Sequence, residues 1–336
     1  VSGNSANRGG GGIYNRGTAT LTNSSVSGNS ANDGGGISNS RGTATLTNSI
    51  IANQQNGGDV GGNRVILSQG VNLVTDGSVT GALTLDPKLG PLQDNGGSTL
   101  TQALAVDSPA INLGDSSLLP DGTTFDQRGN PFNRIVNNGV DLGAFEVQEN
   151  ATATVSIPEK SPALTVDTLV DENDFDLSAG EVSLREAIAF VEAGGSIDFS
   201  DQLSGGTILL NSALAIDQSL SLTGLGVNEL TIDAGGNSRV FLIDDGDDEN
   251  AINVTLEGLT ITGGTTTGDG GGILNRENLT LSNSTVSGNS ANNRGGGISN
   301  GENLTLSNSS VSDNTTLTDS TVSGGSASSS GGGIFN

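Results

Sequence analysis

The chain has no cysteine, histidine, methionine or tryptophan, and it has one tyrosine and eight phenylalanines among 336 residues. Without cysteine there is no disulfide framework and no thiol chemistry. Without histidine the sequence lacks the commonest metal ligand and general base. Because aromatic residues are scarce, any core must be thin and aliphatic.

Basic residues are also few. Twelve Lys and Arg stand against 37 Asp and Glu, for a net charge of −25. This balance opposes nucleic-acid binding, which needs a basic patch to neutralise phosphates. It suits a soluble secreted surface or a medium rich in divalent cations. No apolar run approaches about 18 residues, so the sequence predicts no membrane span.

What the sequence does have is a repeated phrase. Ile273 recurs as Ile298, each inside a GGGI motif, and Leu279, Leu281 and Val286 also recur 25 residues later. The same phrase opens the chain, where GGGIYN at 10–15 returns as GGGISN at 34–39. A fixed period in this range is typical of a solenoid whose turns cannot bury their apolar faces alone.

One repeat predicts three short strands. In GTATLTNS at 17–24, Ala19 and Leu21 alternate with threonines, and further short strands follow at Val26 and at 34–37. Three strands for about 25 residues describe one triangular coil, so the fold class predicted is an all-β, right-handed parallel β-helix in two tandem modules. In the first module, the residues predicted inside are Ile13, Ala19, Leu21, Val26, Ala31, Ile37, Ala44, Leu46 and Ile51.

Asparagine and glycine fit the corners of such a coil because both tolerate left-handed backbone angles. Asn23 and Asn48 occupy equivalent places in the first array, and Asn283 and Asn308 do so in the second. We expect each pair to stack its amides into a ladder between coils.

Residues 84–148 do not follow the repeat. They contain the motifs DPKLGPLQDNGG at 86–97, SPAINLGD at 108–115, DQRGNPF at 126–132 and DLGAFE at 141–146. Taken in this order they resemble the choice-of-anchor Q domain, which closes right-handed β-helix proteins of bacterial surfaces. The resemblance implies that 84–148 is a terminal cap, following the last coils of a first β-helix at 1–83. We expect it to cover the unpaired strand edges at the end of that solenoid.

The second module follows an interdomain linker predicted at 149–164. SLREAIA at 183–189 resembles the CSLREA motif, a short N-terminal domain found ahead of β-helix arrays, and indicates a cap at 165–200. The cysteine of that motif is Val182 here, so the loop at 171–176 must be held without a disulfide. From its own residues, the segment predicts a capping helix at about 183–193, with Ser183 and Glu186 as a capping box and Gly194-Gly195 ending it.

The second β-helix is predicted at 201–336. Its last coil is expected to carry an inserted loop of 11 residues, because Ile298 and Ile334 are 36 residues apart. Both ends of the chain lie inside a repeat phrase, and we therefore expect it to be part of a longer protein.

The alternative function is that of an enzyme. Pectate lyases and polygalacturonases share this architecture, but a polygalacturonase-like site needs a Gly-His-Gly that a histidine-free chain cannot supply. A lyase would need Ca²⁺-binding aspartates stacked on one face, and Asp33, Asp269 and Asp313 do not repeat in register. We therefore propose no catalytic residue, and polysaccharide cleavage stays open as an alternative.

The densest anionic cluster is a candidate calcium site. Calcium takes about six to eight oxygen ligands, and carboxylates on a glycine-containing turn can supply them. The spacing matches neither an EF-hand nor the glycine-rich calcium repeat of β-helices, so a solvated acidic loop competes with the metal site and a Ca-stabilised scaffold remains a second alternative. The candidate ligands are Asp244, Asp245, Asp247, Asp248 and Glu249.

The outward strand faces are the last candidate binding surface. Thr18, Thr20 and Thr22 would form rows with Thr43, Thr45 and Thr47, an arrangement that ice-binding β-helices use, although ordinary strand surface explains it as well. The GGGI phrases also resemble repeats of polymorphic outer-membrane proteins. The sequence therefore predicts a non-enzymatic, secreted or cell-surface scaffold with an adhesive role. Its expected partners are glycans or other surface proteins.

Overall fold

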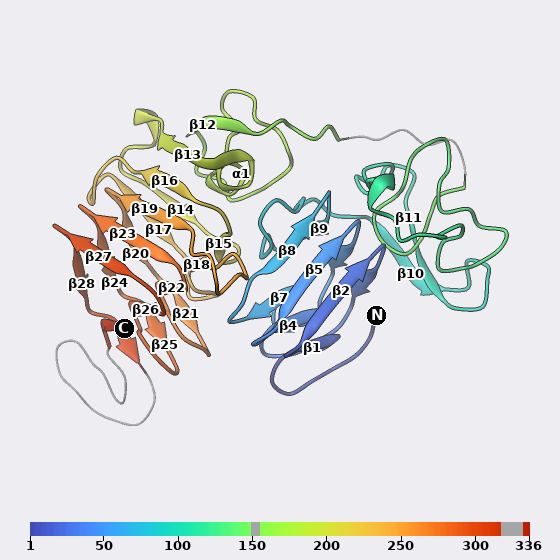
Figure 1. Cartoon of the computed structure of the whole chain (residues 1–336), viewed down its shortest axis with the longest axis horizontal. Helices are drawn as coiled ribbons and strands as arrows, with labels where there is room; N and C mark the ends of the chain where they lie inside the picture. The colour runs from blue at the N-terminus through green and yellow to red at the C-terminus, as the bar shows by residue number, and fades with distance from the viewer. Residues whose placement is uncertain (149–154, 317–331) are drawn as a thin grey trace. The chain divides into compact units, whose positions relative to one another are not determined.

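The computed structural model describes residues 1–148, 155–316 and 332–336. The chain forms two compact units, one of Val1–Gly62 and Ile66–Ile157, the other of Asn63–Val65 and Pro158–Asn336. Each unit is built from parallel strands stacked in register, and α1 (Leu184–Phe190) is the one α-helix among the described residues (Figure 1). The predicted β-solenoid in two tandem modules is confirmed.

The first unit contains three three-stranded parallel sheets, β1-β4-β7, β2-β5-β8 and β3-β6-β9. Each coil contributes one strand to each sheet, so every strand pairs with its equivalent one coil away, as in Ile13↔Ile37↔Val60. The strands are β1 (Ile13–Asn15), β2 (Thr18–Thr22), β3 (Ser25–Ser27), β4 (Ile37–Asn39), β5 (Thr43–Thr47), β6 (Ile50–Ala52), β7 (Val60–Gly62), β8 (Ile66–Gln69) and β9 (Leu73–Val74).

The core of this unit is a single aliphatic stack. Of the nine residues predicted inside, Ile13 and Ala19 are half-buried and pack against the core, and the other seven are buried. Alternation with a period of two identifies these positions because successive side chains of a strand point to opposite faces.

The segment 84–148 lies along the flank of the coils. The Ala144 amide donates to Ser25 Oγ at 3.0 Å, the Gly143 amide to the Asn48 carbonyl at 2.8 Å, and the Asp115 amide to Asn48 Oδ1 at 2.9 Å. These contacts run from coil to coil, beside the corners, whereas we expected the segment across the last strand edges. It also covers the outward side chain of Ile50, which is fully buried. Its own elements are the antiparallel pair β10 (Leu89–Gln93) and β11 (Thr101–Leu104), and the 3₁₀ turn η1 (Ser116–Leu118).

The second unit begins earlier than predicted. Strand β12 (Ser161–Val166) already pairs in parallel with β13 (Val191–Phe199), so 158–164 belongs to this unit and is not linker. Of the rest of the predicted linker, residues 149–154 lie outside the described residues.

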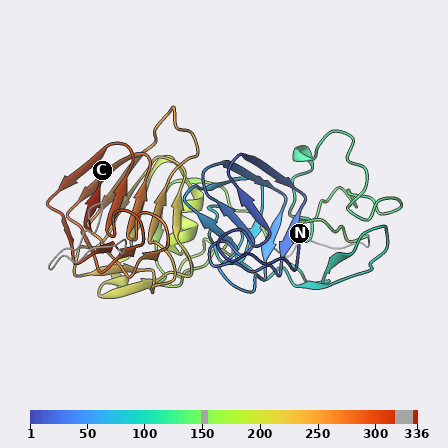
Figure 2. The same cartoon turned by 90° about the horizontal axis from the view of Figure 1, so that it is seen from below.

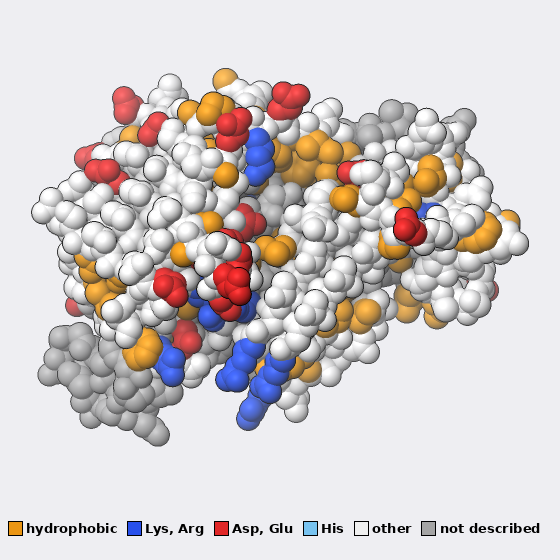
Figure 3. All heavy atoms as spheres, in the orientation of Figure 1, with side chains coloured by type: hydrophobic (Ala, Val, Ile, Leu, Met, Phe, Trp, Pro, Cys, Tyr) orange, Lys and Arg blue, Asp and Glu red, His pale blue; other side chains and the backbone are white. Residues whose placement is uncertain are grey.

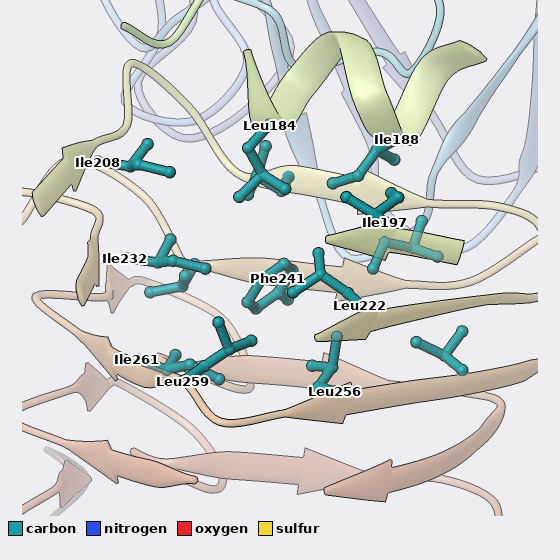
Figure 4. Close-up of a cluster of buried hydrophobic side chains, with 14 of the residues drawn as sticks. Leu184, Ile188, Ile197, Ile208, Leu222, Ile232, Phe241, Leu256, Leu259 and Ile261 are labelled. Atoms are coloured by element: carbon teal, nitrogen blue, oxygen red, sulfur yellow. The ribbon is translucent and has the colours of Figure 1, made fainter. Parts of the chain in front are cut away.

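Helix α1 covers the first coil of this unit. Leu184 and Ile188 point from the helix into the cluster that contains Ile197 and Leu222 (Figure 4). The predicted capping box is present, with both hydrogen bonds between Ser183 and Glu186. The predicted helix end is wrong: the helix stops at Phe190, because the chain becomes extended at Val191 to pair with β12, and Gly194-Gly195 lies inside β13.

The strands of this unit form sheets of six, five, five and three strands, and within each sheet the strands of successive coils lie side by side (Figure 2). Ile298 pairs with Ile334 as well as with Ile273, which confirms the register across the 36-residue interval, and most of the predicted insertion lies outside the described residues. The sheets are β12-β13-β16-β19-β23-β27, β14-β17-β20-β24-β28, β15-β18-β22-β26-β30 and β21-β25-β29. The further elements are η2 (Asp201–Leu203), β14 (Gly206–Leu209), β15 (Leu214–Ile216), β16 (Leu220–Thr223), β17 (Leu230–Asp233), β18 (Phe241–Ile243), β19 (Asn253–Glu257), β20 (Thr260–Thr262), β21 (Thr265–Thr266), β22 (Ile273–Asn275), β23 (Asn278–Ser282), β24 (Thr285–Ser287), β25 (Ser290–Ala291), β26 (Ile298–Asn300), β27 (Leu304–Ser307), β28 (Ser310–Ser312), β29 (Thr315–Thr316) and β30 (Ile334–Phe335).

The corner asparagines have the predicted backbone but not the predicted contacts. Asn23, Asn48, Asn283 and Asn308 have φ between 46° and 49°. Their side-chain amides do not bond one another. Asn48 Nδ2 donates to the Asp115 carbonyl at 2.9 Å, and Asn283 Nδ2 donates to the Glu257 carboxylate at 2.9 Å.

Amide ladders form elsewhere, at asparagines whose side chains are buried. Asn15 donates to Asn39 at 2.9 Å, Asn275 to Asn300 at 2.7 Å and Asn289 to Asn314 at 3.0 Å. These are the asparagines of the GGGI-x-N phrase and of the SGN and SDN phrases. The ladders satisfy polar groups that would otherwise be buried without a partner.

Candidate functional site: the acidic loop and the hydroxyl-bearing faces

The five predicted calcium ligands lie in the loop between β18 and β19. Asp244 is buried, Asp245 is half-buried, and Asp247, Asp248 and Glu249 are exposed. Three carboxylates accept from the backbone two residues ahead: Asp244 from the Gly246 amide at 3.2 Å, Asp245 from the Asp247 amide at 2.8 Å, and Asp247 from the Glu249 amide at 2.9 Å. Such local bonds are typical of aspartate in turns, and they direct each carboxylate to its own segment.

The structure does not gather the five carboxylates around one point, and the two that come close, Asp244 and Asp248, share the Arg64 guanidinium at 3.1 Å and 2.6 Å. Asp244 Oδ2 lies 3.8 Å from the Arg276 guanidinium, which already supplies positive charge. Among residues 1–148, 155–316 and 332–336, no group of three or more acidic side chains is placed to hold a metal ion. The calcium site expected from the sequence is not tested by these contacts.

Glu277, between β22 and β23, holds this loop in place, and its role was not predicted from the sequence. Its carboxylate accepts from the amides of Asp245 at 3.2 Å and of Ile252 at 3.0 Å, so it joins the two ends of the loop. Burial raises the pKa of Glu277 to about 7. A glutamate two residues after the buried Asn275 is the only sequence signal, and it recurs as Glu302 without an equivalent loop.

The sheet β14-β17-β20-β24-β28 presents a continuous row of hydroxyls, and we call its outward surface the five-strand face. The buried alternates Ile208, Ile232, Ile261 and Val286 fix the register. The outward row is Thr207, Thr231, Thr260, Thr285 and Ser310, and beside it runs a second row of Leu209, Asp233, Thr262, Ser287 and Ser312.

The sheet β12-β13-β16-β19-β23-β27 presents a second polar surface, the six-strand face. Asn253, Asn278 and Asn303 form an outward amide row in which neighbours are bonded at 3.2 Å and 2.8 Å. Ser221, Thr255, Thr280 and Thr305 continue the hydroxyls from strand to strand. Charged outward positions on this sheet are few, among them Asp198 and Glu257. On the face of the chain drawn in Figure 3, acidic, basic and hydrophobic side chains are scattered over a largely white surface.

Parallel strands place equivalent side chains about 4.8 Å apart, so both faces are periodic arrays of groups that donate and accept hydrogen bonds. The predicted threonine rows of the first unit are shorter. Thr20 pairs with Thr45 and Thr22 with Thr47, but the third coil substitutes Leu67 and Gln69. The longer row of the five-strand face was not predicted from the sequence, although Thr260 and Thr285 are 25 residues apart.

In the part of the chain that the structure describes, no helix is long and apolar enough to cross a membrane. A scan against protein-family models found no match, and searches of curated proteins and of solved structures found none either.

Proposed function

We propose that this chain is a non-enzymatic β-helical scaffold with an adhesive role outside the cell, and that its hydroxyl-bearing faces contact glycans. The observation that carries the proposal is the continuous row of four threonines and one serine on the five-strand face. A solenoid needs outward polar residues for solubility, but it does not need the same hydroxyl in five successive strands.

The chemistry of the rows favours an uncharged, polyhydroxylated partner. Each hydroxyl both donates and accepts, as sugar hydroxyls do, and the array repeats along the solenoid as sugars repeat along a glycan. The net charge of −25 opposes acidic polymers, because the approach of a polyanion to this surface is unfavourable at low ionic strength. The resemblances of 84–148 and of 183–189 to domains of bacterial surface proteins agree with this location.

The test is retention of soluble neutral polysaccharides, such as xyloglucan and galactomannan, on the immobilised chain, with polygalacturonate as the acidic comparator. The double variant Thr231→Lys/Thr285→Lys interrupts the row twice, and it should reduce retention of the neutral polymers at least about threefold, the effect of losing roughly one hydrogen bond. The control Asn237→Lys/Asn250→Lys adds the same charge in exposed loops and should retain them as the parent does.

Two results would contradict the proposal. One is equal retention by the parent and by the face variant. The other is release of shorter or unsaturated products when the chain is incubated with pectate and other acidic glycans, with and without Ca²⁺, which would favour an enzyme.

A further inference from the structure

The chain contains four Asn–Gly dipeptides, at 56–57, 95–96, 138–139 and 300–301. This dipeptide is chemically labile because glycine has no side chain to obstruct its own amide nitrogen. That nitrogen attacks the side-chain carbonyl carbon of the asparagine, closes a five-membered succinimide ring and expels ammonia, which carries away the amide proton. Water then opens the ring at one of its two carbonyls and leaves aspartate or isoaspartate. The structure distinguishes the four sites by what holds the reacting groups.

At three of the sites the glycine amide is already a hydrogen-bond donor. Such an amide must give up its bond before the nitrogen can attack, and this cost slows the reaction. At two of these sites the asparagine side chain is held as well, because Asn95 Nδ2 donates to the Thr101 carbonyl at 2.8 Å and Asn300 Nδ2 donates to the Glu302 carbonyl. The amide bonds are Gly96 to Asp94 Oδ1 at 2.9 Å, Gly139 to the Val136 carbonyl at 2.9 Å and Gly301 to the Asn275 carbonyl at 2.8 Å.

The fourth site, Asn56–Gly57 in the turn between β6 and β7, lacks these bonds. Among the residues that the structure describes, neither the Gly57 amide nor the Asn56 side chain has a hydrogen-bond partner. The Asn56 side chain is also exposed, so water reaches it and ammonia can leave. Of the four dipeptides, this is the one in which both reacting groups are free.

The fold requires glycine at position 57. Its φ is +80°, and a Cβ there would lie 2.3 Å from the Ala31 carbonyl oxygen of the adjacent coil. A side chain is excluded twice, by the left-handed backbone and by the clash with the neighbouring main chain. The labile dipeptide is therefore a consequence of the close approach between two coils, and only a change of Asn56 can remove it.

The same turn holds the two coils together. The Asn56 carbonyl accepts from the Ala31 amide at 3.3 Å, and the Gly57 carbonyl accepts from the Gly34 amide at 2.8 Å. In isoaspartate the main chain runs through the former side chain, which inserts one methylene. The carbonyl that bonds Ala31 then becomes a carboxylate outside the main chain, and the Gly57 carbonyl must shift. Aspartate, by contrast, changes only an exposed side chain.

We propose that Asn56–Gly57 is a modification site at which the folded chain deamidates spontaneously, and that its isoaspartate form loosens the contact between the turn at 56–58 and the turn at 31–35. The reaction needs no reagent besides water. This inference is independent of the glycan contact proposed above, which involves the other unit.

Peptide mapping by mass spectrometry tests the site. The full chain is incubated at mildly alkaline pH, and conversion at the four dipeptides is compared with that in the same chain unfolded in urea. All four should convert at similar rates in the unfolded chain. In the folded chain Asn56 should convert about three- to tenfold faster than each of the others, the effect of losing about one hydrogen bond. Equal conversion at all four sites of the folded chain, or faster conversion at one of the other three, would overturn the inference.

Two variants test the consequence for the coil. Asn56→Gln removes the labile dipeptide, and Asn56→Asp adds the charge of the modified turn without the inserted methylene. Parent protein that has accumulated isoaspartate should melt about 2–4 °C below fresh parent, and its amides at 31–35 should exchange faster. Asn56→Gln incubated in parallel and freshly purified Asn56→Asp should both match fresh parent. Isoaspartate at 56 with an unchanged midpoint and unchanged exchange would mean that the modification does not loosen the coil.

Discussion

Arg185 and Asp171 form a two-armed ion pair, with Nε to Oδ1 and Nη2 to Oδ2 both at 2.8 Å. The pair joins the loop at 171–176 to helix α1, and both side chains are almost completely buried. The Asn211 amide adds a third bond to Asp171, at 2.7 Å. This pair is one of the contacts that hold the loop in a chain where the cysteine of the resembled motif is Val182.

Asp171→Ala should therefore destabilise the second unit by about 3–5 kcal/mol, because it leaves the Arg185 guanidinium buried without its counter-ion. Denaturant unfolding measures the loss, and amide hydrogen exchange at 184–199 locates it. Asp176→Ala, at an exposed position of the same loop, should leave both measurements as in the parent. An Asp171→Ala protein as stable as the parent would mean that the ion pair does not hold the loop.

Asn289→Ala should cost about 1–3 kcal/mol. The side chain accepts from the Gly264 amide at 2.8 Å and donates to Asn314 and to the Ile261 carbonyl, so alanine leaves buried groups on adjacent coils without partners. The comparison is Asn283→Gly, at an exposed corner with φ of 49° where glycine is equally suited. Chemical denaturation should show a large effect for the first variant and less than about 0.5 kcal/mol for the second. A larger loss of stability in Asn283→Gly than in Asn289→Ala would mean that the corner asparagines, and not the buried ladders, stabilise the coils.

The stability of the first unit should fall as pH rises from about 4 to 7. Burial and the nearby Asp76 raise the pKa of Asp59 to about 7, so between these pH values the unfolded chain releases a proton that the folded chain keeps. Ionisation then favours unfolding, and the loss is complete above pH 7. Burial raises the pKa of Glu146 in the same direction, to about 8.

Thermal midpoints between pH 4.5 and 8 check this expectation. Asp59→Asn keeps an acceptor for the Thr75 hydroxyl, which Asp59 now binds at 2.6 Å, and should reduce the slope of midpoint against pH. A parent protein whose midpoint rises over this range would contradict the prediction.

Calcium should leave the midpoint of the second unit unchanged within about 1 °C. Asp245 and Asp247 already accept from their own loop, and the described residues place no group of carboxylates to share an ion. Melting curves in 1–5 mM CaCl₂ and in chelator are the measurement, with a linked-binding stabilisation of a few kcal/mol as the alternative at saturation. A rise lost in Asp247→Asn/Glu249→Gln would establish the loop as a calcium site.

The repeat made the core predictable. Residues such as Leu21 and Leu46 recur with alternation inside a fixed period, and each strand buries only one face. The capping box at Ser183 was equally local, since its two partners are three residues apart. Both depend on spacing along the chain, which a sequence displays directly.

The missed features depend on partners distant in sequence. The helix ends at Phe190 because Val191 pairs with Ser161, and the flanking segment follows corners such as Asn48, 67 residues before Asp115. The fourth short strand of the later coils, in β21-β25-β29, has two residues per coil and no apolar alternation. The charge density of the acidic loop is visible in the sequence, but the sequence does not show that three of its carboxylates accept from their own loop.

The buried amide ladders have a direction. Asn15 donates to Asn39, Asn289 to Asn314, and Asn275 to Asn300, which in turn donates to Asn336, so each amide points its N–H toward the later coil. In the exposed row of the six-strand face the direction is reversed, because Asn278 donates back to Asn253. In the buried ladders the amide dipoles therefore add head to tail, and each bond polarises the next. Loss of a central amide divides such a chain into two shorter dipoles, whereas loss of a terminal one only shortens it. Tolerance to substitution at these asparagines should thus be lowest in the middle of each ladder, although all coils have nearly the same sequence.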